Sequence, residues 1–569
     1  NLTIGDKADI RGSIFAGGNG RKKRIDTGKA DKDVKISNDT RAPELVGKVI
    51  GSTKVFFQGS TAQAPSVYGD IYGGGNLAQV NGDTYVNIYA GNLAGQVFGG
   101  GKGRIFDDNG NALDPSLYTY ADITGSTDEQ GNTDGKGNTH VTLAQDPGGQ
   151  EEDENKKKTD NFSINVIWDK LWKSGDTFYA WDSSVKGNEG DTITVDKTKF
   201  YADKKFVNPH NIYGGGNLAC RVSGKATVEV LKGMTPFSLL KTDEWKASYT
   251  DNKNPHFSVF GGGYGANTLV GSTDVTVDVE GDYGIYNAEA GDNDEQLAKP
   301  YKNKASKAAN NQTEMPVFDN SNGIPNFTVH SVFGGGYAGI VSDSTHVLVD
   351  GQTFLHRVYG GGFGDPTSTT DNTTGQVGGS TEVYVRGAKT YGDIFGGGAG
   401  VRPLTPTSAP FTNVARVLGT TAVEVSDDAA VYGKVYGGGD VANVGPADYT
   451  NPSDYSKDLP ASATQLNQAT GQIADVEEPY THSNHRTFVN IIGGDIYGEV
   501  FGGGKGLPKD SANNYREGGR INGNTLVHIA NSLNHSIVSE AQLDQDGNNI
   551  PYVWNRIYGG CAYGTVNGN

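Results

Sequence analysis

The chain has 569 residues, of which 35% are hydrophobic and 84 are glycine, and its formal net charge at pH 7 is −18. It is too long for one compact core but normal for a repeat array, and its glycines follow no Gly-X-Y period, which excludes collagen. The acidic charge argues against a nucleic-acid partner, which needs a basic surface, and no apolar run is long enough for a membrane span.

A short apolar strand that ends in three glycines recurs along the whole chain. Each copy has Ile or Val, then Phe or Tyr, then Gly-Gly-Gly, as in "HSVFGGGYAG" (330–339). Full copies begin at Ile71, Val97, Ile212, Val259, Val332, Val358, Ile394, Val435 and Val500, and variants begin at Ile14 and Ile557. A phosphate-binding loop is needed once and is followed by a helix, so a motif with eleven copies indicates architecture instead.

A second motif, Gly-x-Thr-x-Val-x-Val/Ile, alternates with the first. Clear copies are at 82–88, 271–277, 379–385, 419–425 and 523–529; looser ones surround Thr53, Thr139, Thr345 and Thr487, and Ala226 takes the Thr position in another. Period-two alternation predicts strands with Thr and Val on the buried face. The outward positions include Lys54, Tyr85, Glu229, Asp274, Glu382, Glu424 and His528.

The repeat length predicts the fold class. Without insertions the triplets are 26 residues apart, as between Gly73 and Gly99, which leaves no room for a crossover helix. Stacking such units gives an all-β fold, a parallel β-solenoid or β-helix of about eleven coils, with residues 1–569 as a single repeat array. Equivalent residues should then stack, so the aromatic residues should form one column and the Thr and Val/Ile residues columns inside the coil.

The glycine triplets are interpreted as corners of the coil. Glycine would be selected there by a positive φ, and by close approach of neighbouring coils that leaves no room for a Cβ atom. The predicted corner residues are the middle glycines, Gly74, Gly100, Gly215, Gly262, Gly335, Gly361, Gly397, Gly438 and Gly503.

Additional residues fall at two places in the repeat. One set of insertions follows the triplet, at 103–136, 364–376, 402–416, 442–484 and 506–520. The other follows the Thr-x-Val strand, at 144–210, 233–256, 282–328 and 532–554. Residues 144–210 form the largest and are expected to make a small subdomain. Insertions in repeat proteins map to defined edges, where they commonly build a binding face.

All five tryptophans belong to the second set of insertions: Trp168, Trp172, Trp181, Trp245 and Trp554. One interpretation is that long insertions need small cores of their own, which Trp supplies. The other is a recognition surface that stacks on sugar rings or contacts a protein partner. The second interpretation makes these five residues the candidate ligand-binding residues.

Candidate residues for catalysis or metal binding are few. Polysaccharide-cleaving β-helix enzymes need paired carboxylates or a carboxylate-bound cation, whereas the outward acids Asp274, Glu382 and Glu424 lie on different coils. His482 and His485 lack a third ligand. We therefore assign no catalytic or metal-ligating residue. The Asp/Asn/Gly loops 107–114 and 544–549 are of the kind that Ca²⁺ uses, although ordinary Asx-Gly turns explain them more simply.

The two motifs together resemble the repeats of large glycine-rich β-solenoid surface proteins of gut-type bacteria, which look like adhesins. The resemblance covers nearly the whole chain and carries over no catalytic residue. It implies a non-catalytic, secreted or cell-surface stalk or adhesin that binds a glycan or a host or neighbour-cell protein. The alternatives are a β-helix polysaccharide lyase or hydrolase, and a filament module. Because the chain begins at Asn1 and ends within a repeat, we expect a portion of a longer protein whose end coils stack on further repeats.

Overall fold

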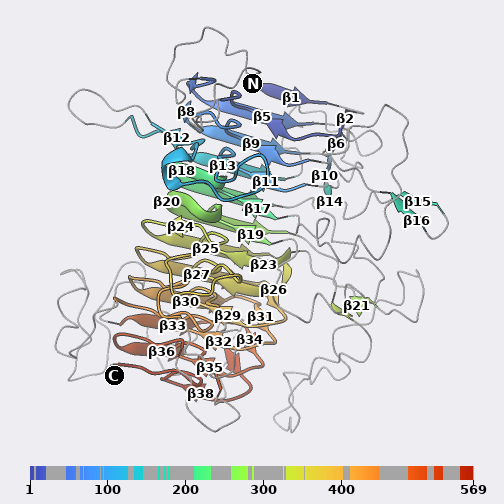
Figure 1. Cartoon of the computed structure of the whole chain (residues 1–569). Coiled ribbons are helices and arrows are strands. Elements are labelled where there is room, and N and C mark those ends of the chain that lie inside the picture. The colour runs from blue at the N-terminus through green and yellow to red at the C-terminus, as the bar shows by residue number, and fades with distance from the viewer. Residues whose placement is uncertain are drawn as a thin grey trace, which may run out of the picture.

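The computed structural model describes residues 1–5, 8–20, 46–58, 65–67, 69–89, 91–93, 95–125, 134–144, 164–166, 172–174, 177–179, 211–231, 258–279, 285–286, 324–325, 329–351, 353–401, 411–446, 485–508, 518–529 and 551–567. They form a stack of strands with the N-terminus at one end and the C-terminus at the other (Figure 1). The one helical turn in the described part of the chain is η2 (Pro115–Leu117). The predicted parallel β-solenoid is confirmed.

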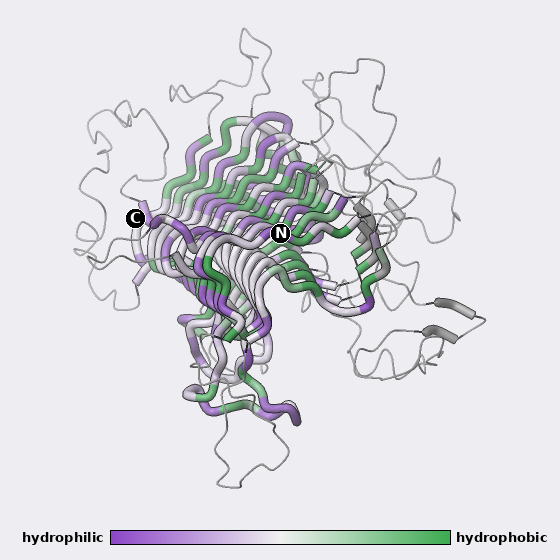
Figure 2. The backbone as a smooth tube through the Cα atoms, turned by 90° about the horizontal axis from the view of Figure 1, so that it is seen from above, coloured by the Kyte–Doolittle hydropathy of each residue, from purple (hydrophilic) through white to green (hydrophobic). Residues whose placement is uncertain are grey.

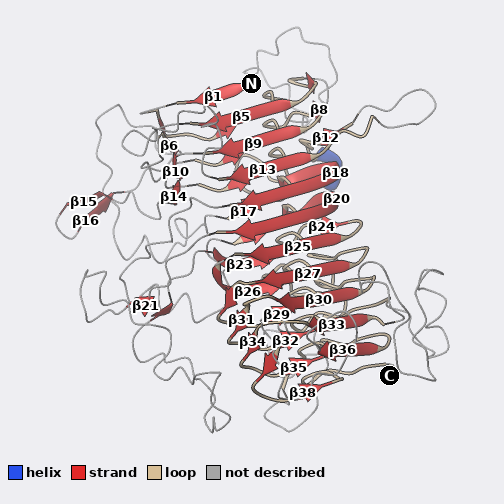
Figure 3. Ribbon diagram, turned by 180° about the vertical axis from the view of Figure 1, so that it is seen from behind, coloured by secondary structure: helices blue, strands red, loops and turns tan. Residues whose placement is uncertain are grey.

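The Thr-x-Val strands form one parallel sheet along the whole stack (Figure 3). Its strands, in order, are β1 (Leu2–Ile4), β5 (Thr53–Phe57), β9 (Thr84–Ile88), β13 (Thr139–Leu143), β18 (Asn217–Val230), β20 (Tyr264–Asp278), β25 (Thr345–Asp350), β27 (Thr381–Arg386), β30 (Thr421–Ser426), β33 (Thr487–Ile491) and β36 (Thr525–Ile529). The short strands β4 (Val49–Ile50), β8 (Val80–Asn81), β12 (Ile123–Thr124) and β24 (Ile340–Val341) extend it. Equivalent residues are in register, with Val86 opposite both Val55 and Val141.

The strands that precede the glycine triplets form a second parallel sheet. They are β3 (Ile14–Phe15), β7 (Ile71–Tyr72), β11 (Val97–Phe98), β17 (Ile212–Tyr213), β19 (Val259–Phe260), β23 (Val329–Phe333), β26 (Phe354–Tyr359), β29 (Ile394–Phe395), β32 (Val435–Tyr436), β35 (Val500–Phe501) and β38 (Ile557–Tyr558). The same sheet includes β28 (Lys389–Thr390), β31 (Ala430–Val431), β34 (Asp495–Ile496) and β37 (Tyr552–Val553).

Three smaller sheets complete the described structure. A parallel sheet joins β2 (Asp9–Ile10), β6 (Ser66–Val67), β10 (Gly91–Leu93) and β14 (Ile164–Val166). Two antiparallel pairs lie within insertions, β15 (Trp172–Ser174) with β16 (Thr177–Tyr179), and β21 (Ile285–Tyr286) with β22 (Ile324–Pro325).

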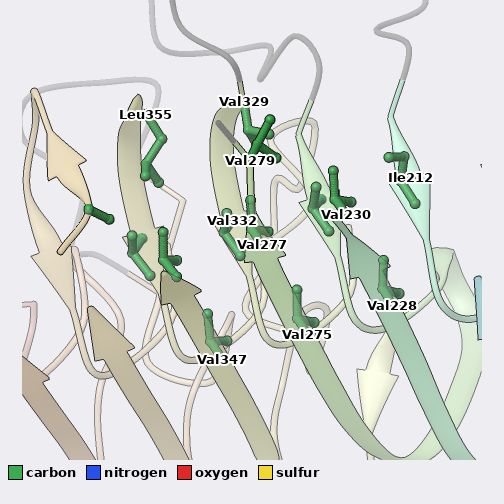
Figure 4. Packing of buried hydrophobic residues seen from close by; sticks show 14 of the residues in the cluster. Ile212, Val228, Val230, Val275, Val277, Val279, Val329, Val332, Val347 and Leu355 are labelled. Atoms are coloured by element: carbon green, nitrogen blue, oxygen red, sulfur yellow. The ribbon is translucent and has the colours of Figure 1, made fainter. Parts of the chain in front are cut away.

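The core lies between the two long sheets, and alternation along each strand builds it. In β9 the side chains of Thr84, Val86 and Ile88 are buried while the intervening ones are half-exposed. The buried valines and isoleucines of both sheets make one cluster through the stack, part of which Figure 4 shows around Val228 and Val275. Seen along the stack, residues of like hydropathy superpose from coil to coil (Figure 2).

Buried threonine hydroxyls connect the two sequence motifs. The Oγ1 atom of Thr345 donates a hydrogen bond of 2.6 Å to the carbonyl of Gly360, the first glycine of the following triplet. The same bond, 2.5 to 2.6 Å long, is made by Thr53, Thr84, Thr139, Thr273, Thr381, Thr421 and Thr487. Because a buried carbonyl is destabilising without a partner, these bonds explain why threonine occupies this inward position.

The residues before the triplets form the predicted aromatic column. Its rings are Phe15, Tyr72, Phe98, Tyr213, Phe260, Phe333, Tyr359, Phe395, Tyr436, Phe501 and Tyr558. Consecutive ring centroids are 4.5 to 5.1 Å apart and the ring planes differ by at most 12°. Each ring between Phe15 and Tyr558 therefore has both faces covered by the rings of the neighbouring coils.

The structure corrects one of the two reasons given for the glycine triplets. None of the triplet glycines has a positive φ. A Cβ atom on Gly335 would instead lie 2.6 Å from the backbone N and Cα of Gly362 in the next coil. Glycine is needed because the backbones of successive coils touch there. Left-handed residues occur instead two positions after some of the triplets, at Leu77, Leu218, Gly265, Ala338, Val441 and Tyr563.

Candidate functional site

Three long insertions leave the frame at the same edge in successive coils. The ends of β13, β18 and β20 are neighbours, because Leu143 lies opposite Val230, which lies opposite Val277. After the insertions the chain returns at β17, β19 and β23, which are also neighbours. Insertions 144–210, 233–256 and 282–328 are therefore anchored about 4.8 Å apart along the stack. Their shared position after the Thr-x-Val strand predicted a common edge, and the pairing of these strands confirms it for the three insertions.

The tryptophan candidates lie mostly outside the described residues. This holds for Trp168, Trp181 and Trp245. The backbone of Trp172 belongs to β15 and lies opposite Tyr179 of β16. These four residues come from two insertions that the frame anchors on neighbouring coils.

Trp554 lies on the frame, directly after β37. Its ring stacks on Tyr497 with centroids 6.0 Å apart, and Tyr497 stacks on Tyr432 at 5.2 Å. Tyr552 contacts the same indole at 4.6 Å. Trp554 thus extends a second stack of rings, after Tyr432 and Tyr497, and its role there is in packing.

The outward acids lie on one face of the Thr-x-Val sheet but are engaged with their neighbours. Asp274 is 2.5 Å from Nζ of Lys225 and 3.0 Å from Nδ1 of His346. These contacts, with His346 the largest cause, lower the pKa of Asp274 to about 2.

The other two acids also have partners on this face. Glu424 accepts a hydrogen bond of 3.1 Å from Nδ2 of Asn490, and burial raises its pKa. Glu382 accepts one of 3.5 Å from the Tyr384 hydroxyl. The contact between Glu424 and Asn490 links β30 to β33 and stabilises the sheet, whereas that between Glu382 and Tyr384 lies within β27.

Three aromatic rings lie directly after three successive triplets. No role was assigned to these residues from the sequence. Tyr264, Tyr337 and Phe363 have centroids 5.1 and 5.0 Å apart and are half-buried. They cover Tyr213, Phe260 and Phe333 of the aromatic column at 5.6, 5.8 and 5.7 Å, with interplanar angles of 66°, 70° and 83°. We call Tyr264, Tyr337 and Phe363 the covering rings.

The loop 107–114, a candidate calcium loop, is a turn stabilised by its own backbone. Oδ1 of Asp107 accepts hydrogen bonds from the backbone N–H groups of Asn109 and Asn111, and Oδ2 accepts one from Nδ2 of Asn111. The second candidate loop, 544–549, and His482 lie outside the described residues. In the part of the chain that is described, no three His, Cys, Asp or Glu side chains gather as metal ligands would.

Comparisons with protein-family models, curated proteins and solved structures give no significant match. Among the described residues, no helix has the length and apolar character needed to cross a membrane.

Proposed function

We propose that this protein is a non-catalytic β-solenoid of the cell surface or extracellular space whose insertions bind a glycan or a protein. The observation that carries the proposal is the anchoring of three long insertions at one edge of three successive coils. Residues from several insertions can then contribute to one binding surface, as loops do on other rigid scaffolds. The tryptophans of 144–210 and 233–256 supply the side chains typical of such surfaces.

The continuity of the frame supports a scaffold role. Val97 and Ile212 lie on either side of insertion 144–210, yet they are paired in register. The rings of Phe98 and Tyr213 remain stacked at 4.9 Å. An insertion of this size therefore leaves the coil geometry unchanged, so insertions can vary in ligand specificity without disturbing the fold.

The polysaccharide lyase or hydrolase remains the alternative. Its best location would be the outer face of the Thr-x-Val sheet, where Asp274, Glu382 and Glu424 are displayed. Asp274 is paired with Lys225 and His346, and the other two acids also accept hydrogen bonds from protein side chains. Because these carboxylates already have protein partners, we favour a binding function for this protein over an enzymatic one.

A glycan array probed with the intact chain tests the proposal, in parallel with incubation on the same polysaccharides. We expect binding to a subset of glycans, or to a cell-surface protein, with no new reducing ends and no unsaturated uronate. Product release would favour the enzyme. The filament alternative predicts assemblies that grow with concentration, which light scattering would detect.

A further inference from the structure

We propose that the side chains of Lys505 and Asp393 condense into an intramolecular isopeptide bond, which cross-links two coils of the frame covalently. This modification goes beyond the proposed function, because it needs neither an insertion nor a ligand. An amine, an acceptor carboxyl group, a backbone donor for that carboxyl group and a second carboxylate lie together beside the aromatic column.

Lys505 and Asp393 are brought together by the stacking of coils. Nζ of Lys505 lies 2.7 Å from Oδ2 of Asp393, although the two residues are 112 positions apart in the sequence. Asp393 directly precedes β29, Lys505 follows the triplet after β35, and β32 pairs with both strands from between them (Figure 1). An amide between the two side chains would therefore join two coils across a third.

The surroundings of this pair are partly apolar and shielded from solvent. The exposed fractions of its two side chains are 24% and 15%, against 49% and 29% for the pair of Lys225 and Asp274. Nζ of Lys505 lies 5.6 Å from the ring centroid of Phe395 and 5.9 Å from that of Tyr436, and both rings are buried. Because condensation releases water, exclusion of bulk solvent favours the amide over its hydrolysis.

The carboxyl group of Asp393 is already held in one orientation. Its Oδ1 atom accepts a hydrogen bond of 3.0 Å from the backbone N–H of Lys434 in the next coil, while Oδ2 contacts the lysine. Negative charge develops on Oδ1 when an amine adds to Cγ, and a fixed backbone donor stabilises such an oxyanion. The same N–H group would hold the amide oxygen in the product.

The second carboxylate, that of Asp440, belongs to the intervening coil. Asp440 forms a β-bridge with Lys505 along the stack, and its side chain is buried. Burial, followed by the charges of Asp393 and Asp440, raises the pKa of the Tyr436 phenol, so both carboxylates lie near the ring beneath the lysine. We assign to Asp440 the transfer of protons during the reaction.

The reaction balances without a further reactant. The neutral amine of Lys505 adds to Cγ of the neutral Asp393 carboxyl group, and these forms differ from the ion pair only in the position of one proton. Asp440 accepts a proton from the adding nitrogen and returns one to Oδ2, which leaves as water while the Nζ–Cγ bond remains. No electron is exchanged. Proximity in a rigid frame drives the step, because intramolecular reactions reach effective concentrations of about 10⁵ M or more.

Mass spectrometry of the full chain after denaturation tests the proposal. We expect an intact mass lower than that of the sequence by one water molecule and, after digestion, a branched peptide that joins Lys505 to Asp393. Lys505→Arg keeps the positive charge beside Asp393 but lacks the nucleophilic amine, so it should have its full mass. Asp440→Asn should slow or abolish the loss of water, and Asp440→Glu, which keeps a carboxyl group, should restore it.

Lys225 and Asp274 provide the internal control, because they are even closer, at 2.5 Å, but more exposed. Their peptides should be recovered unlinked. A parent mass equal to that of the sequence, or a water loss located at residues other than Lys505 and Asp393, would overturn the proposal. Persistence of the water loss in Lys505→Arg would also overturn it, since a succinimide at an Asp residue has the same mass change.

Urea unfolding gives a second, independent test of the cross-link. A bond between Asp393 and Lys505 restricts the unfolded chain, as a disulfide does. Lys505→Arg should therefore have a parent-like circular dichroism spectrum but unfold at a lower urea concentration. Equal unfolding midpoints for Lys505→Arg and the parent would contradict a covalent link between the coils.

Discussion

For single residues, the clearest sequence requirement is at the glycine triplets, where the backbones of successive coils are in contact. Gly335→Ala would place a Cβ atom 2.6 Å from the backbone of Gly362, so the coils must shift. We expect a loss of about 1 to 3 kcal/mol in the free energy of unfolding, typical of overpacking. The matched control is Gly560→Ala, at the same triplet position in the last coil, where no atom lies within 4 Å.

Thermal and urea unfolding of both glycine variants measure this difference. Gly560→Ala should be neutral or slightly stabilising, because alanine restricts the unfolded chain. If both variants unfold like the parent, close approach between coils is not what selects glycine.

The threonine hydroxyls make a second residue-scale prediction. Thr345→Val keeps the shape of the side chain but removes the donor to Gly360 O, leaving a buried carbonyl without that hydrogen bond. We expect a loss of about 1 to 3 kcal/mol in urea unfolding. Thr276→Val, on the outward face of β20, should change stability by less than about 0.5 kcal/mol. Similar losses for the two variants would refute a specific role for the inward hydroxyl.

At the scale of strands, the Lys225–Asp274–His346 contacts link β18, β20 and β25 and predict a pH dependence. The pKa of Asp274 is lowered from 3.8 to about 2, so the folded state favours the ionised carboxylate. This contribution is complete above the unfolded pKa near 4 and is lost as the pH falls toward 2. Asp274→Asn should therefore be less stable than the parent at pH 5, and the gap should narrow at pH 2 to 3. A gap independent of pH would contradict this assignment.

The sequence predicts those features of the strands that a local pattern determines, and misses those that depend on how the chain turns between strands. Alternation in 82–88 and its relatives is a local pattern, so the buried Thr and Val columns and the aromatic column followed from repetition alone. The positions of the left-handed residues did not follow from repetition. Non-glycine residues such as Leu77 and Val441 adopt a positive φ, which their side chains disfavour.

The covering rings were missed for a related reason. Tyr337 is visible in "HSVFGGGYAG", but its contact with Phe260 belongs to a different coil and depends on how the chain turns after the triplet. A useful signal was present, namely an aromatic residue directly after three successive triplets at Tyr264, Tyr337 and Phe363. The tryptophan surface stays a prediction, because the described residues include only the backbone of Trp172 and the packed Trp554.

In the whole molecule, a frame of coils in register carries the long insertions that we propose to bind the ligand. Residues 89–95 connect the same two points of the coil as residues 144–210, because Ile88 lies opposite Leu143 and Val97 opposite Ile212. A variant with 144–210 replaced by a copy of 89–95 should therefore keep the solenoid.

Thermal unfolding of this graft variant, followed by circular dichroism and paired with the glycan array, tests whether the frame folds independently of insertion 144–210. We expect a parent-like β-sheet spectrum, a melting temperature no lower than that of the parent, and loss of the array ligands that depend on 144–210. A variant that is unfolded, or that melts far below the parent, would show instead that the insertion is part of the folding unit.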